Sequence, residues 1–184
     1  MKQKNNMKEF IQSEATKLII TNGVKNTSLA DISKACGISK GTLYYHYSSK
    51  DDLICDIATN HLKVITDSVI ECIQSIENSE SDKMIILILE KIADIKVRGR
   101  IHMYLLCEAI TSNDKLKNKI KANYSDWRAS LKKELMKTTN DNEKSDALSC
   151  LLVSIVDGLV IQGVLSEENI PFENIANVLV DKFI

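Results

Sequence analysis

The sequence predicts an all-α fold, and three observations support that class. The 184 residues include one proline and six glycines, whereas a β-fold of this length needs many tight turns built from these residues. Hydrophobic residues make up 44% and charged residues 27%, which excludes a disordered or collagen-like chain. Apolar residues also recur at helical spacing through nearly the whole chain. We therefore expect about nine helices, in one large domain or two small ones.

The first part of the chain contains short helices with clear boundary signals. The first helix carries one apolar stripe and is ended by Gly23. A second helix is expected from Leu29 to Cys36, and Ser28 begins a capping-box-like pattern ahead of it. Ser39 can cap a third helix, from Lys40 to about Tyr47.

Longer helices are expected in the rest of the chain. The spacing of apolar residues predicts them at 51–76, 82–97, 100–112, 115–138 and 143–166, with a last helix from Pro171 to the end. Gly99 separates two of these helices. Pro171 suits a first helical position, where its missing N–H has no intrahelical partner to lose.

Charge is unevenly distributed along the chain. Residues 1–50 contain eight lysines and three acidic residues, a net charge of +5, so the other residues carry −6 of the total of −1. A basic segment joined to an acidic remainder suits a polyanionic partner for the first part. A solvated lysine-rich face would give the same count.

The sequence gives little support for secretion, membrane insertion, a metal site or disulfide bonds. The N-terminus MKQKNNMKEF has no apolar run, so no secretory signal is indicated and a cytoplasmic protein is expected. The apolar stretch 147–165 has the length of a membrane span, but central Asp157 would cost about 2.5–3.5 kcal/mol there. We expect a buried helix of a soluble protein and no membrane association. The five cysteines are widely spaced and include no CxxC pair, so we expect neither a metal site nor a disulfide framework. We also expect no cofactor.

Residues 28–47, SLADISKACGISKGTLYYHY, have the pattern of a helix-turn-helix unit. Gly37 lies where the chain must reverse between two short helices. Leu43 and Tyr47, four residues apart, are expected in the core of the unit. Tyr44 and Tyr45 cannot share that face, so at least one of them should be exposed.

The second helix of this unit has the chemistry of a DNA-reading helix. Such a helix places its N-terminal residues near base edges in the major groove. Lys40 can donate to guanine O6 or N7, and Thr42 can bond a base edge or touch a thymine methyl. Gly41 allows the backbone to approach DNA closely. Groups suited to phosphate oxygens follow in Tyr44, Tyr45, His46 and Lys50.

The segment from Phe10 to Leu53 resembles the DNA-binding domain of TetR-family transcriptional regulators. The match lies in Asp31–Leu53, DISKACGISKGTLYYHYSSKDDL. Ser33 and Cys36 stand where alanine is usual, and Tyr47 stands where phenylalanine is usual. None of these departures removes a DNA-facing group.

The resemblance implies a division into a DNA-binding domain at 1–50 and a helical effector-binding and dimerisation domain at 51–184. It also implies a homodimer on a palindromic operator. The residues that it implies at the DNA are Thr27, Ser28, Ser39, Lys40, Gly41, Thr42, Tyr44, Tyr45, His46 and Lys50.

The C-terminal part supports a dimer independently. The helix at 147–165 is apolar almost all round and must be covered on every side, by a second subunit or by the chain itself. The last helix is amphipathic. Gly158 and Gly163 lie inside the apolar helix, where they indicate close packing rather than a turn. The expected dimerisation residues are Leu152, Ile155, Val156, Leu159, Val160, Ile175, Leu179 and Phe183.

Candidate effector contacts are less specific. Tyr124 and Trp127 share an apolar stripe and either wall a pocket or belong to the core. Glu108, on an apolar face, either pairs with a cationic ligand or reaches solvent or an internal cation. The resemblance implies a hydrophobic or amphipathic effector. The full candidate set is His61, His102, Tyr104, Cys107, Glu108, Tyr124 and Trp127.

These features favour a ligand-responsive transcriptional repressor. An enzyme is not expected, because the sequence has no Ser/His/Asp set, HExxH motif, glycine-rich phosphate loop or close carboxylate pair. Two alternatives keep DNA binding and change the input signal. One is thiol oxidation, with Cys36 activated by Lys34 or Lys40. The other is a protein partner in place of a small molecule.

Overall fold

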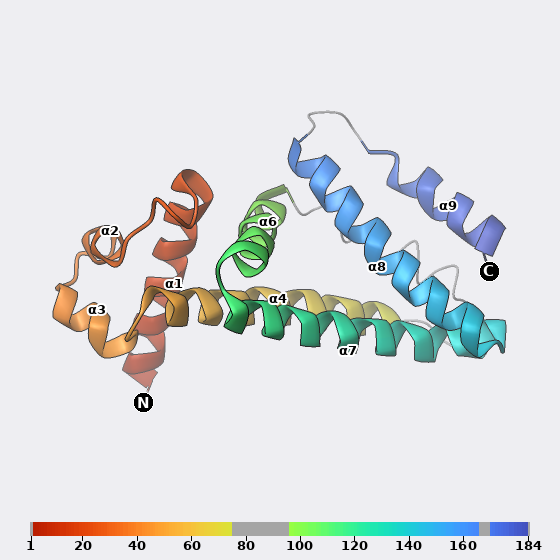
Figure 1. The fold of residues 1–184 in the computed structure, drawn as a ribbon, viewed down its shortest axis with the longest axis horizontal. Helices are drawn as coiled ribbons and strands as arrows, with labels where there is room; N and C mark the ends of the chain where they lie inside the picture. Colours follow the sequence, from red (N-terminus) through yellow and green to blue (C-terminus); the bar gives the residue numbers. More distant parts are fainter. Residues whose placement is uncertain (1, 75–95, 166–169, 184) are drawn as a thin grey trace. The chain divides into compact units, whose positions relative to one another are not determined.

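The computed structural model describes residues 2–74, 96–165 and 170–183, and every regular element in these ranges is an α-helix (Figure 1). The predicted all-α class is confirmed. The helix expected at 82–97 lies outside the described residues except for 96 and 97, which begin α6. The described helices are α1 Lys2–Asn22, α2 Leu29–Ala35, α3 Lys40–His46, α4 Lys50–Gln74, α6 Lys96–Thr111, α7 Asp114–Thr139, α8 Asn142–Leu165 and α9 Phe172–Phe183.

The helices belong to two compact units, which we describe separately. The first consists of Met1–Leu62 and Arg100–Ile120, and the second of Lys63–Gly99 and Lys121–Ile184. The first unit therefore contains more than the segment 1–50 expected to bind DNA. It also includes the beginning of α4, most of α6 and the beginning of α7.

The core of the first unit forms around α1. Ile11, Ala15 and Ile19 are buried at intervals of four residues, which places them on one face of the helix. They pack in a core that also contains Ile32 of α2 and Leu43 of α3. The helix ends as expected, because the next residue, Gly23, has φ +80°, in the left-handed region that glycine adopts cheaply.

Two predicted helix boundaries are wrong. Gly99 lies inside the first turn of α6, which begins at Lys96, so it does not separate two helices. A glycine in a helix interior costs only about 1 kcal/mol and is readily overridden by its surroundings. Pro171 precedes α9 instead of beginning it, and its carbonyl accepts a hydrogen bond from Ile175 N at 3.0 Å.

The second unit is built on an antiparallel pairing of α7 with α8. The partners advance in opposite directions along the two helices: Lys132 with Asp146, Arg128 with Cys150, and Tyr124 with Asp157. The turn between the helices passes through Asn140, which has φ 49°. Leucines at 131, 135, 148 and 152 are buried in this unit.

Helix α8 stands out by its composition. Among the residues that the structure describes, it is the one helix long and apolar enough to cross a membrane by length and composition alone. It was expected to be a buried helix, yet only 28% of its most apolar 18-residue segment is buried within the chain. Apart from its chain neighbours and the adjacent backbone of α8, the described residues place no atom within 4 Å of a Cβ built on Gly158, so they do not supply the close packing expected there.

Candidate nucleic-acid interface

Helix α2 begins with the predicted capping box. Ser28 Oγ accepts a hydrogen bond from Asp31 N at 3.2 Å, and Ser28 N donates to Asp31 Oδ2 at 2.9 Å. These bonds to Ser28 lower the pKa of the Asp31 carboxyl group, which keeps it ionised as a cap. Ser28 Oγ also lies 2.5 Å from Asp31 Oδ2 and donates its hydrogen there. A phosphate oxygen must therefore compete with Asp31 for the Ser28 hydroxyl.

Gly37 lies in the turn between α2 and α3, as the sequence predicted. Gly37 has φ +64°, a conformation that costs a residue with a side chain about 1–2 kcal/mol. Ile38 N donates to Ser33 O at 3.0 Å across this turn. Ser39 then caps α3, with its Oγ accepting from Thr42 N at 3.0 Å. The chain therefore enters α3 in a fixed direction.

Helix α3 has one buried face and one exposed face. Leu43 and Tyr47 are buried, as their spacing predicted. Tyr44 is 55% exposed and Tyr45 is 70% exposed, so both tyrosines face solvent. The remaining exposed residues of the helix and its cap are Ser39, Lys40, Gly41 and Thr42. The core thus holds α3 by two side chains and leaves its polar first turn accessible.

The side chains of three other predicted DNA contacts are buried or half-buried. Thr27 is buried and its hydroxyl donates to Gly23 O at 2.8 Å, so its side chain is not presented to DNA. Lys50 is half-buried and donates to Val24 O, which leaves two of its three ammonium hydrogens for phosphate. His46 is half-buried, and no described residue bonds its buried Nδ1.

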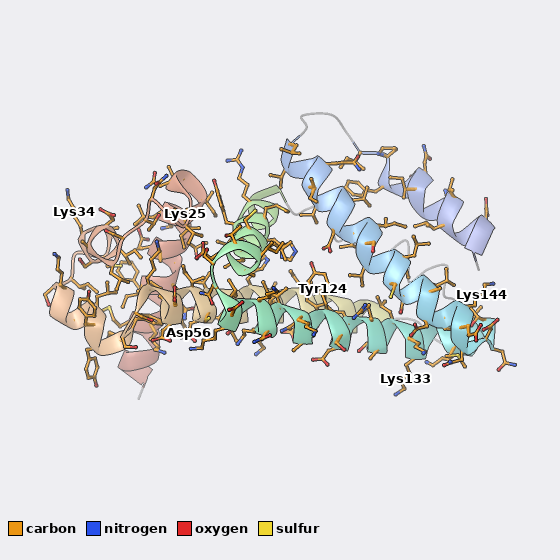
Figure 2. All side chains as sticks on the ribbon, viewed as in Figure 1. Lys25, Lys34, Asp56, Tyr124, Lys133 and Lys144 are labelled. Atoms are coloured by element: carbon orange, nitrogen blue, oxygen red, sulfur yellow. The ribbon has the colours of Figure 1, made fainter. Side chains whose placement is uncertain are left out.

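Two exposed lysines of this region were not among the predicted contacts. Lys25 lies in the connection between α1 and α2, and Lys34 lies on α2 (Figure 2). Both count toward the +5 charge of the first 50 residues, which was the signal in the sequence that could have found them.

The candidate effector residues of the first unit do not form a single cluster in it. His61 of α4 and His102 of α6 lie together, with Nε2 and Nδ1 3.2 Å apart. Tyr104 packs near the end of α1, where a Cβ built on Gly23 would lie 3.6 Å from its ring. Cys107 is exposed and Glu108 is half-buried on the same helix.

The other two candidates belong to the second unit and contact each other. The rings of Tyr124 and Trp127 have centroids 5.1 Å apart. Tyr124 donates to Asp157 at 2.9 Å, and burial, followed by the charge of Asp157, raises the pKa of Tyr124. Trp127 is buried and donates to Thr66 Oγ1 at 2.7 Å, an arrangement typical of a core tryptophan. The half-exposed Tyr124 is the more accessible of the two.

Cys36 does not have the properties expected of a thiol sensor. Its side chain is buried, and this burial, with the nearby charge of Glu14, raises the pKa of the thiol. Activation by Lys34 or Lys40 would have lowered it. The expectation of an activated Cys36 is therefore wrong in direction.

The expected dimerisation residues lie partly in the core of the chain. Leu152, Leu159, Val160 and Leu179 are buried within it, Ile155, Val156 and Ile175 are half-buried, and the side chain of Phe183 lies outside the described residues. The apolar residues that α8 exposes are different: Leu151 at 37%, Ile161 at 39% and Leu165 at 81%. With Ser154 and Gly158 they follow a three-four spacing, which defines one stripe along the helix. We call these five residues the α8 stripe.

Comparison with known proteins agrees with this geometry. Residues 11–57 match the family model of bacterial regulatory proteins of the tetR family, and residues 82–178 match the LmrA/YxaF-like C-terminal domain of transcriptional regulators. The second match alone spans more than half of the 184 residues. Together the two matches include α2, α3 and α6 to α8 in full, and parts of α1, α4 and α9.

Similar proteins match over 79–95% of their own lengths. The chain is 21% identical to the HTH-type transcriptional regulator LmrA of Bacillus subtilis over 95% of both chains. It is 25% identical to the biofilm operon negative regulator IcaR of Staphylococcus epidermidis, covering 80% of this chain and 79% of IcaR. A crystal structure of AibR in complex with isovaleryl coenzyme A and operator DNA matches with a TM-score of 0.71 and 19% identity, covering 94% of this chain and 95% of AibR. The chain belongs to the TetR family of transcriptional regulators, and it is a DNA-binding protein and not an enzyme.

Proposed function

We propose that this protein is a homodimeric repressor that leaves a palindromic operator when a small-molecule effector binds. The observation that carries the proposal is the two-faced α3. Leu43 and Tyr47 fix it to the core, while Lys40, Gly41 and Thr42 stay exposed for base edges. Because the family is one of bacterial DNA-binding regulators, we also propose that the protein acts in the cytoplasm.

The proposed phosphate contacts surround this reading turn. Tyr44 and Tyr45 expose their rings beside it, and Ser39, His46 and Lys50 add a hydroxyl, an imidazole and an ammonium group. Ser28 can join them if phosphate displaces Asp31 from its hydroxyl. Thr27 contributes to the fold of the preceding turn, and we leave its side chain out of the interface.

The apolar residues that α8 leaves exposed support the proposed dimer. The α8 stripe exposes three large apolar residues on one face, although a helix of this composition needs cover on all sides. Gly158 lies at its centre with open space around its Cα, which allows a second helix to approach closely. A second copy of the chain supplies the same stripe by two-fold symmetry. We therefore propose the α8 stripe as the centre of the dimer interface.

The effector response needs a connection from the proposed effector-binding domain, residues 51–184, to α3. Helix α4 begins three residues after Tyr47, and Lys50 at its first position donates to the Val24 carbonyl. A shift of α4 would therefore move both α3 and the turn that precedes α2. AibR was crystallised with both isovaleryl coenzyme A and operator DNA, which supports separate effector and DNA sites in this chain. IcaR is a negative regulator, which supports repression.

Electrophoretic titration against DNA tests the proposal. The wild-type protein should select a duplex with an inverted repeat from a randomised pool and bind it with strong salt dependence. Replacing Tyr44 and Lys50 by alanine should weaken that binding and flatten its dependence on salt. Unchanged binding by this variant would overturn the proposed interface.

A further inference from the structure

The hydroxyl of Tyr47 links the recognition helix to α1. Tyr47 is the residue that caps the C-terminus of α3, and its ring is buried. Its Oη accepts a hydrogen bond from Gln12 Nε2 on α1 at 2.8 Å. Burial raises the pKa of Tyr47 to about 12, against the opposing effect of the Gln12 hydrogen bond, so the hydroxyl remains protonated at neutral pH.

The same hydrogen-bonded chain continues to α4. Gln12 Oε1 accepts from Asn60 Nδ2, so one amide joins the cap of α3 on one side to α4 on the other. The residues lie 35 and 48 positions apart in the sequence, and the bonds therefore connect three separate helices.

An ion pair reinforces the connection next to it. Lys8 Nζ of α1 lies 3.1 Å from Asp56 Oδ2 of α4. The same ammonium group lies 4.9 Å from the centroid of the Tyr47 ring, within the range of a cation–π interaction. Figure 2 labels Asp56 on α4. We call Lys8, Gln12, Tyr47, Asp56 and Asn60 the Tyr47 clamp.

A short helix needs such an external constraint. Helix α3 has seven residues, and helices of this length have little stability of their own. Apolar packing of Leu43 and Tyr47 holds α3 against the core but is not directional, whereas a hydrogen bond favours one distance and one angle. The clamp therefore constrains how the C-terminal end of α3 is turned relative to α1 and α4.

We propose that the Tyr47 clamp positions the recognition helix for operator binding, with Gln12 and Asn60 as positioning residues that act through the Tyr47 hydroxyl. None of the bonds in the clamp requires contact between these side chains and DNA. The inference rests on the proposed operator binding. It adds that residues of α1 and α4 set the orientation in which Lys40 and Thr42 meet the bases.

The test uses full-length protein and a duplex that the wild-type protein has selected from a randomised pool. Tyr47→Phe removes only the hydroxyl, and Gln12→Leu removes the amide that reaches it. Each should raise the operator Kd by about three- to tenfold, as expected for one lost hydrogen bond. The slope of log Kd against log salt should not change, because no phosphate contact is lost. The double variant should lose less than the sum of the two single losses, because both changes break the Gln12–Tyr47 bond.

Three measurements separate this role from other roles. A purely structural role would lower the Tm and leave the operator Kd unchanged at temperatures well below it. A direct phosphate contact by Tyr47 would reduce the salt slope. Additive losses in the double variant would show that the two residues act independently. Each of these outcomes overturns the clamp.

Thr21→Ala is the matched control, because it removes an exposed hydroxyl of α1 that bonds only to its own helix, at Lys17 O. It should bind the operator as the wild type does, and a loss as large as that of Tyr47→Phe would overturn the clamp. If wild-type protein enriches no duplex, the proposed function itself fails, and the clamp fails with it.

Discussion

Gly41→Ala should stabilise the protein while weakening its binding to DNA. Gly41 lies in the exposed first turn of α3. A Cβ added there would meet Ser39 Oγ at 3.7 Å, an ordinary van der Waals contact, so the free protein can accommodate alanine. Glycine within a helix costs about 0.5–1 kcal/mol relative to alanine. For a chain of this size, that gain corresponds to a rise in Tm of roughly 1–4 °C.

The effect on DNA should have the opposite sign. If the backbone at Gly41 approaches base edges closely, the new methyl group fills space that the DNA occupies. Overpacking by one methyl group costs about 1–3 kcal/mol, which is roughly a five- to 150-fold increase in operator Kd. The two quantities can be measured on the same sample, by calorimetry and by fluorescence anisotropy with a labelled operator.

Ser130→Ala supplies the control for this prediction. Ser130 is exposed on α7, bonds only to Asp126 O of its own helix, and gains helix propensity when replaced by alanine. It should raise the Tm slightly and leave the operator Kd unchanged. A Gly41→Ala variant that is more stable and binds DNA as well as the wild type would refute the close approach of α3 to the bases.

Further predictions follow from the same geometry. Lys50→Ala should weaken operator binding and reduce the slope of log Kd against log salt by about one, because a charged phosphate contact is lost. Tyr44→Phe should weaken binding with an unchanged slope, because the lost contact is neutral. Identical slopes for the two variants would contradict a charged phosphate contact by Lys50. Ile161→Glu, one helical turn from the centre of the α8 stripe, should convert dimers to folded monomers in analytical ultracentrifugation. A wild-type monomer would contradict the proposed dimer. The pKa of Tyr47 is raised by burial to about 12, above the unfolded value near 10, so the native state retains a proton that the unfolded state releases. The free energy of unfolding should therefore fall as pH rises from about 10 toward 12, and Tyr47→Phe should make this fall shallower in urea titrations; an equally steep fall in the variant would refute it.

Local signals in the sequence predicted the α2–turn–α3 unit well. Ser28 and Ser39 cap their helices, and Gly37 adopts the positive φ that its place in the turn required. These features depend on residues within a few positions of one another. The exposure of the first turn of α3 followed from the same short-range pattern, because Leu43 and Tyr47 had to share the buried face.

Features that depend on long-range packing were not predictable in the same way. The segment 147–165 of α8 is apolar almost all round, so its sequence does not show which face the chain itself covers. The exposed stripe therefore differs from the expected residues. Thr27 is polar but buried, because its hydroxyl finds a backbone acceptor four residues earlier. Tyr47 bonds to Gln12 of α1, and Gln12 bonds to Asn60 of α4, and these residues lie far apart in the sequence.

In the proposed dimer, the α3 helices of two subunits read the two halves of an operator. Selection of DNA by the wild-type protein and by Lys40→Ala tests this proposal most directly. Both proteins would be used to enrich duplexes from the same randomised pool, followed by sequencing. The wild type should enrich an inverted repeat, and Lys40→Ala should lose the preference for guanine at one symmetric pair of positions while keeping the rest of the site. Enrichment of no sequence by the wild type, or of an identical site by the variant, would contradict the role of α3 as the reading helix.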